Sequence, residues 1–117
     1  MMVTWVTLAN TNYSIVQYNK VGFPLTLQAS GDITKFTDGG SEHRVLYIHR
    51  VKLTGLVPNQ TYEYHCGGLE GWSALYAFKA LKSGVDWSPQ MAVFGDLGSV
   101  CILNDSGCTF ARRTRVE

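Results

Sequence analysis

The residue whose setting most suggests chemistry is an aspartate that follows a short apolar run. Met91-Ala92-Val93-Phe94 is continuous and apolar, and it ends at Gly95-Asp96. Such a run is typical of a buried parallel strand whose carboxyl end carries a functional group. The glycines on either side of the aspartate let the backbone turn sharply and approach a site closely. An isolated Gly-Asp pair is common at turns, so this signal needs support from the rest of the chain.

The three histidines could suggest a metal site, but their spacing argues against one. His43, His49 and His65 fall on expected strands or strand ends, and none has ligand spacing with another His, Cys or Asp. We therefore expect structural histidines. His49 falls on the apolar face of its strand, where an imidazole needs a partner, and we expect it to donate a hydrogen bond rather than bind an ion.

The cysteines do not define a disulfide framework. Cys66, Cys101 and Cys108 are odd in number and lack Cys-x-x-Cys spacing, so neither a zinc ribbon nor a complete set of disulfides is indicated. For Cys66, a disulfide in a longer protein and a buried free thiol are equal alternatives.

Three triplets match the acceptor sequence for N-glycosylation, and they begin at Asn12, Asn59 and Asn104. Two of the three fall in expected loops, which favours a secreted protein. Met1 leads directly into an alternating segment without a basic leader region. No apolar run approaches the roughly 20 residues that cross a bilayer. We expect neither a signal peptide nor a membrane partner in this chain.

Length and net charge limit the number of domains and the kinds of partner that the chain can have. With 117 residues, of which 45% are hydrophobic, the chain suits one domain with a real core. The net charge of +1 gives no long-range field that would attract nucleic acid or an anionic membrane. The basic cluster of Arg112, Arg113 and Arg115 has no interleaved aromatic residues, so we interpret it as a solvated tail.

The elements that would position these residues are short strands. Residues 3–8 and 14–18 alternate β-branched or aromatic residues with polar ones, and we expect them to pair as a hairpin. Residues 25–29 and 33–36 predict two shorter strands around Gly31-Asp32. The strands are separated by turn residues at short intervals, which is typical of an all-β domain.

A longer strand is expected over residues 43–53. Every second side chain from residue 45 onward falls on one face of this strand, and we expect that face to be buried in the core. That face consists of Val45, Tyr47, His49, Val51 and Leu53.

The next strand begins near Tyr62, and Tyr62, Tyr64 and Cys66 share a face. The spacing of Leu56, Pro58 and Tyr62 is typical of a tyrosine corner, in which a tyrosine hydroxyl bonds to upstream backbone.

A turn over residues 67–73 and a last strand over residues 75–81 complete the domain. Aromatic residues at period two belong more often to a core than to a carbohydrate or peptide platform, so we place Trp5, Trp72, Tyr47 and Tyr62 in the core.

The sequence thus predicts an all-β, fibronectin type III or immunoglobulin-like antiparallel β-sandwich over residues 1–82. Residues 83–89 are expected to be a linker, and residues 90–98 change the architecture to a truncated piece of an α/β domain. Residues 99–117 form a divergent tail.

Several segments, in the right order and spacing, resemble animal purple acid phosphatases of the metallophosphoesterase superfamily. The resemblance extends from Val3 to about Gly98. Its segments are Met2-Val3-Thr4-Trp5, Phe36-Thr37-Asp38-Gly39-Gly40, Leu46-Tyr47-Ile48-His49-Arg50-Val51, Tyr62-Glu63-Tyr64-His65-Cys66-Gly67, Gly71-Trp72-Ser73, Trp87-Ser88-Pro89 and Ala92-Val93-Phe94-Gly95-Asp96-Leu97-Gly98.

This resemblance implies that residues 1–82 are the fibronectin III-like N-terminal domain of such an enzyme, without its first strand. Residues 90–98 then begin the catalytic metallophosphoesterase domain, and Asp96 matches an aspartate that ligates a ferric ion. In the full-length family that ion pairs with iron, zinc or manganese, and the two metals hydrolyse phosphate monoesters at acidic pH. A secreted or lysosomal location and a catalytic domain as partner are implied in the same way, whereas a homodimer is left open.

The other four of the family's five metal-ligand motifs are not found in the chain. One carboxylate cannot hold two metals. We therefore expect no catalytic residue and no cofactor in this chain, which we interpret as a non-catalytic N-terminal portion of an acid phosphatase. The alternatives are a free-standing fibronectin-like binding module and an unproductive truncated isoform. The sequence that follows Gly98 in the gene would discriminate between them.

Overall fold

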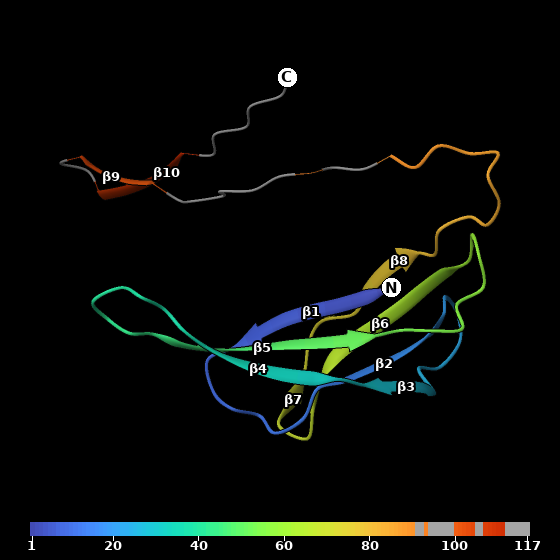
Figure 1. Ribbon diagram of the computed structural model, residues 1–117, viewed down its shortest axis with the longest axis horizontal. Helices are drawn as coiled ribbons and strands as arrows, with labels where there is room; N and C mark the ends of the chain where they lie inside the picture. Colours follow the sequence, from blue (N-terminus) through green and yellow to red (C-terminus); the bar gives the residue numbers. More distant parts are fainter. Residues whose placement is uncertain (91–92, 94–99, 105–106, 112–117) are drawn as a thin grey trace. The chain divides into compact units, whose positions relative to one another are not determined.

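The computed structural model describes residues 1–90, 93, 100–104 and 107–111 of the chain. It divides into two compact units, Met1–Asp86 and Trp87–Glu117, which are described separately. The first unit is an antiparallel β-sandwich, as predicted, in which two sheets enclose one core (Figure 1). None of the described residues forms a helix long and apolar enough to cross a membrane.

The first sheet has three strands in the order β1-β5-β4. Their bounds are Met2–Thr7 for β1, Val45–Lys52 for β5 and Asp32–Thr37 for β4. The central strand β5 places His49 opposite Trp5 of β1 and opposite Ile33 of β4. β1 and β4 are therefore the two edges of this sheet.

The second sheet has five strands, with the order β3-β2-β6-β7 and with β8 also paired to β6. Their bounds are Leu27–Ser30 for β3, Ile15–Lys20 for β2, Thr61–Gly68 for β6, Gly71–Trp72 for β7 and Tyr76–Lys79 for β8. Because β7 and β8 pair with different parts of β6, together they form one edge of this sheet.

The core lies between the sheets because each strand turns one apolar face inward. β1 and β5 contribute Val3 and Val51, and β2 contributes Val16, which is fully buried. On the predicted inward face of β5, the side chains from His49 onward are buried, whereas Tyr47 is only half-buried. The period-two pattern thus identified the inward face correctly, and burial is greatest toward the end of the strand.

The predicted hairpin of the first two strands is wrong. β1 pairs with β5 in the first sheet, and β2 pairs with β3 and β6 in the second. The segment between them therefore carries the chain from one sheet to the other. Both strands have an apolar face that needs cover, and placing them in opposite sheets buries the two faces against each other.

The two shorter predicted strands also lie in different sheets, and they are separated by a glycine that no other residue could replace without a backbone shift. Gly31 separates β3 from β4, and a Cβ atom there would collide with the backbone carbonyl of Arg50. The Gly31 amide donates to the Ser14 carbonyl oxygen at 3.0 Å. The chain thus crosses between the sheets at a point of close backbone contact.

Two element boundaries differ from the predictions. β5 begins at Val45, because His43 adopts a φ of 44°, a left-handed conformation that ends a strand. The predicted turn over residues 67–73 is instead mostly strand: β6 extends to Gly68 and β7 occupies Gly71–Trp72. A Cβ atom at Gly67 would collide with the Gly71 carbonyl, so the hairpin needs this glycine.

In the second unit, β9 (Val100–Asn104) and β10 (Gly107–Ala111) pair as an antiparallel hairpin. This hairpin was not predicted from the sequence, in which residues 99–117 form a divergent tail. Of the predicted strand at residues 91–94, only Val93 is described, and it is not in a strand. The other residues of that strand and Asp96 lie outside the described residues.

The predicted tyrosine corner is present. Tyr62 is buried near the start of β6, and its hydroxyl oxygen accepts a hydrogen bond from the Val57 amide at 2.9 Å. The bond spans the connection from β5 to β6 and therefore fixes how the chain passes from the first sheet to the second.

Replacing Tyr62 by Phe is expected to lower the free energy of unfolding by about 1–2 kcal/mol, because the Val57 amide loses its acceptor while the ring packing is kept. Urea denaturation measures the change. The matched control is Tyr76→Phe on β8, since that ring is about half exposed and its hydroxyl makes no side-chain hydrogen bond among the described residues. An equal loss in both variants would contradict the role given to the corner.

Candidate functional site

The most organised polar cluster in the described residues surrounds His49 in the core. His49 is fully buried, its Nε2 lies 2.9 Å from Thr7 Oγ1, and its Nδ1 lies 2.6 Å from Ser14 Oγ. The imidazole also stacks on Trp5, with ring centroids 4.8 Å apart and planes 5° from parallel. Thr7 belongs to β1 and Ser14 directly precedes β2, so the ring links the two sheets.

The hydrogen bonds around His49 assign its neutral tautomer. The Thr7 hydroxyl donates to the Ala9 carbonyl at 2.7 Å, so Thr7 Oγ1 is the acceptor for the Nε2 proton of His49. The single proton of the Ser14 hydroxyl has two acceptors in reach, His49 Nδ1 at 2.6 Å and the Asp32 carbonyl at 3.3 Å, and the shorter contact assigns it to an unprotonated Nδ1. Burial lowers the pKa of His49 below its ordinary value of 6.5, in agreement with this assignment.

A Ser–His pair at 2.6 Å has the geometry of an activated nucleophile, but two observations favour a structural role. Ser14 is 4% exposed and His49 is fully buried, so a substrate cannot reach the hydroxyl. The second imidazole nitrogen donates to a threonine rather than to a carboxylate that would stabilise an imidazolium. As predicted from its position on the strand, His49 donates a hydrogen bond within the core.

The other two histidines are also engaged in structure. His65 Nε2 lies 2.9 Å from Gln17 Oε1, and its ring stacks on Trp72 with centroids 4.2 Å apart. His43 lies in the exposed loop between β4 and β5. Across the described residues, no group of three or more His, Cys, Asp or Glu side chains is arranged to hold a metal ion.

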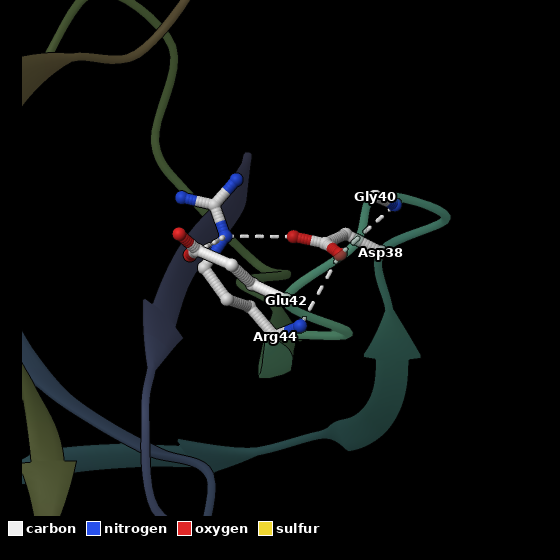
Figure 2. Close-up of polar contacts among 4 residues, drawn as sticks. All are labelled: Asp38, Gly40, Glu42 and Arg44. Carbon is white, nitrogen blue, oxygen red and sulfur yellow. Dashed lines mark hydrogen bonds and ion pairs between the residues drawn. The ribbon is translucent and has the colours of Figure 1, made fainter.

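An ion pair closes the loop between β4 and β5, as Figure 2 shows. Asp38 Oδ2 accepts from Arg44 Nε at 2.7 Å, and Asp38 Oδ1 accepts from the amides of Gly40 and Arg44 at 3.2 Å each. The hydrogen bond from the Arg44 side chain lowers the pKa of the Asp38 carboxyl below its ordinary value of 3.8. The Asp-Gly-Gly segment singled out in the sequence therefore shapes a loop.

An apolar groove runs between β1 and the β7–β8 edge of the second sheet, and we call it the edge groove. Its volume is about 570 Å³. Val3 and Trp5 line it from β1, and Tyr64, Trp72 and Tyr76 line it from the second sheet. Trp72 is 42% exposed there, so its predicted place in the core is wrong: β7 is a short edge strand, and none of the described strands pairs with its outer side.

Comparison with known proteins decides the family. A family model described as the N-terminal domain of purple acid phosphatase matches residues 1–80. The chain belongs to the purple acid phosphatase family.

Acid phosphatase type 7 of Homo sapiens is 48% identical over 99 residues, which are 85% of this chain and 23% of the human protein. Acid phosphatase type 7 of Danio rerio is 48% identical over 100 residues, covering 85% of this chain and 22% of the fish protein. Purple acid phosphatase 22 of Arabidopsis thaliana is 33% identical over 102 residues, covering 84% and 21%. The chain spans less than a quarter of the length of these curated relatives.

The match to the purple acid phosphatase N-terminal domain coincides with the sandwich unit, Met1–Asp86. Of the site residues predicted from the sequence, Asn12 and Asn59 are exposed in loops, with φ values of 36° and 61°. Asn104 ends β9, and its side chain is outside the description. Asp96, expected to be a metal ligand in full-length relatives, lies outside the described residues.

Sequence reasoning missed the two hydroxyl partners of His49. Thr7 continues the inward period of Val3 and Trp5 along β1, and Ser14 is two residues before the fully buried Val16. The signal that could have found them is that both are small hydroxyl residues at inward positions, in a domain where a histidine also points inward. The sequence does not show that these hydroxyl groups and His49 become neighbours. Among the described side chains, Cys66 is a free thiol buried in the core.

The pKa direction of His49 predicts how stability depends on pH. The unfolded imidazole takes up a proton near pH 6.5, whereas the buried ring resists protonation until a lower pH. Between these two pKa values the unfolded state binds more protons, so the free energy of unfolding falls as the pH falls through that window. Urea midpoints between pH 7.5 and pH 5 measure the effect.

Replacing His49 by Phe, which keeps a ring against Trp5 but cannot titrate, should flatten this dependence. The control His43→Gln removes an exposed histidine and should leave the slope in place. An imidazole NMR titration of the unmodified chain gives an independent check, with a His49 pKa below 6.5 expected. A slope that survives His49→Phe unchanged would contradict the assignment.

Proposed function

We propose that this chain is a non-catalytic N-terminal support domain, and that phosphate monoester hydrolysis belongs to a catalytic metallophosphoesterase domain of the longer family proteins. The observation that carries the proposal is the match of the family's N-terminal domain to residues 1–80, the same part of the chain that folds as the sandwich. The relatives are phosphatases by name, and each is more than four times as long as the segment it shares with this chain.

The side chains in the described residues do not fit a dinuclear metal centre. They provide no group of three His, Cys, Asp or Glu residues, whereas a two-metal site needs several nitrogen and oxygen ligands. His49 is committed to two hydroxyl groups, and the Asp38 carboxylate is committed to Arg44. We therefore derive no catalytic step for this chain, and any iron, zinc or manganese belongs to the proposed catalytic domain.

The full chain should not hydrolyse p-nitrophenyl phosphate at pH 5 in the presence of iron and zinc. Turnover should stay at the level of a metal-only blank, and elemental analysis of the same sample should find no stoichiometric metal. The matched control is Asp96→Asn, which removes the one residue of the chain that resembles a family metal ligand. Metal-dependent turnover that Asp96→Asn abolishes would contradict the proposal.

The alternative function, a free-standing binding or interaction module, is favoured by one observation. The edge groove exposes aromatic side chains beside a sheet edge, which is a common setting for strand-mediated recognition. In a support domain, the groove would be covered by another part of the full-length protein. In a free-standing module, it would be the binding surface.

We also infer that the protein enters the secretory pathway, as a secreted or lysosomal glycoprotein. The support is the resemblance together with the exposure of Asn12 and Asn59 in loops. Each of these asparagines begins an acceptor triplet, and a transferase acts on exposed, flexible sequence of this kind.

When the chain is directed into the secretory pathway of animal cells by an added leader, we expect glycans at Asn12 and Asn59. Removal by an endoglycosidase should lower the apparent mass, and Asn12→Gln or Asn59→Gln should each remove one glycan. Asn104→Gln tests the third triplet. Asn10→Gln is the matched control, because Asn10 lies in the same loop as Asn12 but begins no acceptor triplet. A mass that the endoglycosidase leaves unchanged would contradict the inference.

A further inference from the structure

The acceptor triplet that begins at Asn12 has an exposed first residue and a buried last one. Asn12 lies on the surface in a loop, and Tyr13 is 44% exposed. Ser14 is 4% exposed, and its hydroxyl oxygen lies 2.6 Å from His49 Nδ1. The residue that would carry a glycan is thus accessible, whereas the hydroxyl that completes the triplet lies in the core.

The hydroxyl at the third position is part of what a glycosylating enzyme recognises. The acceptor sequence ends in Ser or Thr, and these two residues have a hydroxyl group in common, so an oligosaccharyltransferase needs contact with that group. In the folded domain the Ser14 hydroxyl is enclosed by His49 Nδ1 and by the Asp32 carbonyl oxygen at 3.3 Å. The Ser14 carbonyl oxygen also accepts from the Gly31 amide at 3.0 Å. An enzyme reaches the hydroxyl only after these contacts break.

The loop around Asn12 is held by further hydrogen bonds. The Asn12 amide donates to Asn10 Oδ1 at 3.3 Å, and Thr11 Oγ1 donates to the Tyr13 carbonyl oxygen at 3.2 Å. Asn12 itself has a φ of 36°, in the left-handed region. Presenting the triplet to an enzyme in another conformation therefore requires opening both this loop and the start of the second sheet.

The triplet that begins at Asn59 differs in where its hydroxyl residue lies. Thr61 is the first residue of β6, and the inward face of the strand is taken by the next residue, the buried Tyr62. Thr61 is half-buried, and its hydroxyl makes no side-chain hydrogen bond among the described residues. Of the two acceptor triplets whose side chains the structure describes, the one at Asn12 has its hydroxyl in the core.

We propose that Asn12 is a glycosylation site that is open only before the domain folds, and that the entry of Ser14 into the core closes it. This inference rests on the proposed passage of the protein through the secretory pathway. In the transfer, Asn12 Nδ2 forms a bond to the anomeric carbon of the sugar. The bond from that carbon to the pyrophosphate of a lipid-linked oligosaccharide breaks, the lipid pyrophosphate leaves, and one amide proton is released. The attached glycan is compatible with the fold because Asn12 is exposed.

Folding and glycosylation therefore compete for the same serine. A folded domain of ordinary stability is unfolded for about one part in a thousand of the time, or less. Because transfer to Asn12 needs the open form, its rate in the folded chain should be lower than in an unfolded chain by a similar factor. The stability of the core around His49 thereby controls how readily Asn12 is modified.

Purified oligosaccharyltransferase, with a lipid-linked oligosaccharide as donor, tests the proposal on the full unglycosylated chain. Val51→Asp places a carboxylate at a fully buried position and should unfold the sandwich without altering the triplet. Transfer to Asn12 should be at least about a hundredfold faster in this variant than in the unmodified chain. The matched control is Gln28→Asp, which adds the same charge at an exposed position on β3 and should be as slow as the unmodified chain. Circular dichroism establishes which chains are folded.

Mass spectrometry of tryptic peptides measures the two sites separately, because Lys20 and Lys52 lie between Asn12 and Asn59. Transfer to Asn59 in the unfolded variant verifies that the enzyme and the donor are active. Leu53→Ala removes a buried side chain without adding a charge, and should give a rate at Asn12 between those of the folded and the unfolded chains.

Equal rates at Asn12 in the folded unmodified chain and in Val51→Asp would overturn the proposal. So would transfer to Asn59 but not to Asn12 in the unfolded variant, since Asn12 would then be no acceptor. A failure of the secretory inference has a different result: no site is glycosylated in cells, while the purified enzyme still distinguishes the folded chain from the unfolded one. That result supports the closing of the site by folding and contradicts only the secretory inference.

Discussion

A fully buried imidazole holds the two sheets of this domain together, and its need for partners constrains the structure around it. His49 sits in the central strand of the first sheet, with both ring nitrogens out of reach of water. Leaving one of them without a partner would cost roughly 1–3 kcal/mol. Thr7 satisfies one nitrogen from the neighbouring strand, and Ser14 satisfies the other from the entry to the second sheet. Because the Ser14 carbonyl oxygen also accepts a hydrogen bond from the Gly31 amide, two of the three crossings between the sheets, β1 to β2 and β3 to β4, meet at this residue.

This arrangement supports the proposal that the domain has a supporting role. Three of its polar side chains make hydrogen bonds within the domain: His49 with Ser14 in the core, His65 with Gln17, and Asp38 with Arg44 in a loop. The aromatic side chains of the edge groove, by contrast, remain exposed at the surface. In a purple acid phosphatase, whose length greatly exceeds the shared segment, such a domain can contribute contacts while the chemistry is located elsewhere.

The sequence predicted the strands well because alternation is local. A period of two residues shows in any window that contains a strand, and so does the spacing that leads to the Tyr62 corner. Strand pairing was not predictable in the same way, since alternation in β1 and β2 is compatible with one sheet or with two. The partners of His49 escaped prediction for a related reason: Thr7 and Ser14 become its neighbours only after the chain has crossed between the sheets. The family resemblance came from ordered segments, which extend over the whole domain.

The central claim is that His49 and Ser14 form a coupled pair across the two sheets. A double-mutant cycle of Ser14→Ala and His49→Phe tests it most directly, with the free energy of unfolding measured at pH 7.5. We predict that the double variant is less destabilised than the sum of the single variants, with a coupling energy of about 1–2 kcal/mol. Additivity within about 0.3 kcal/mol would contradict the account, because the two residues would then stabilise the sandwich independently.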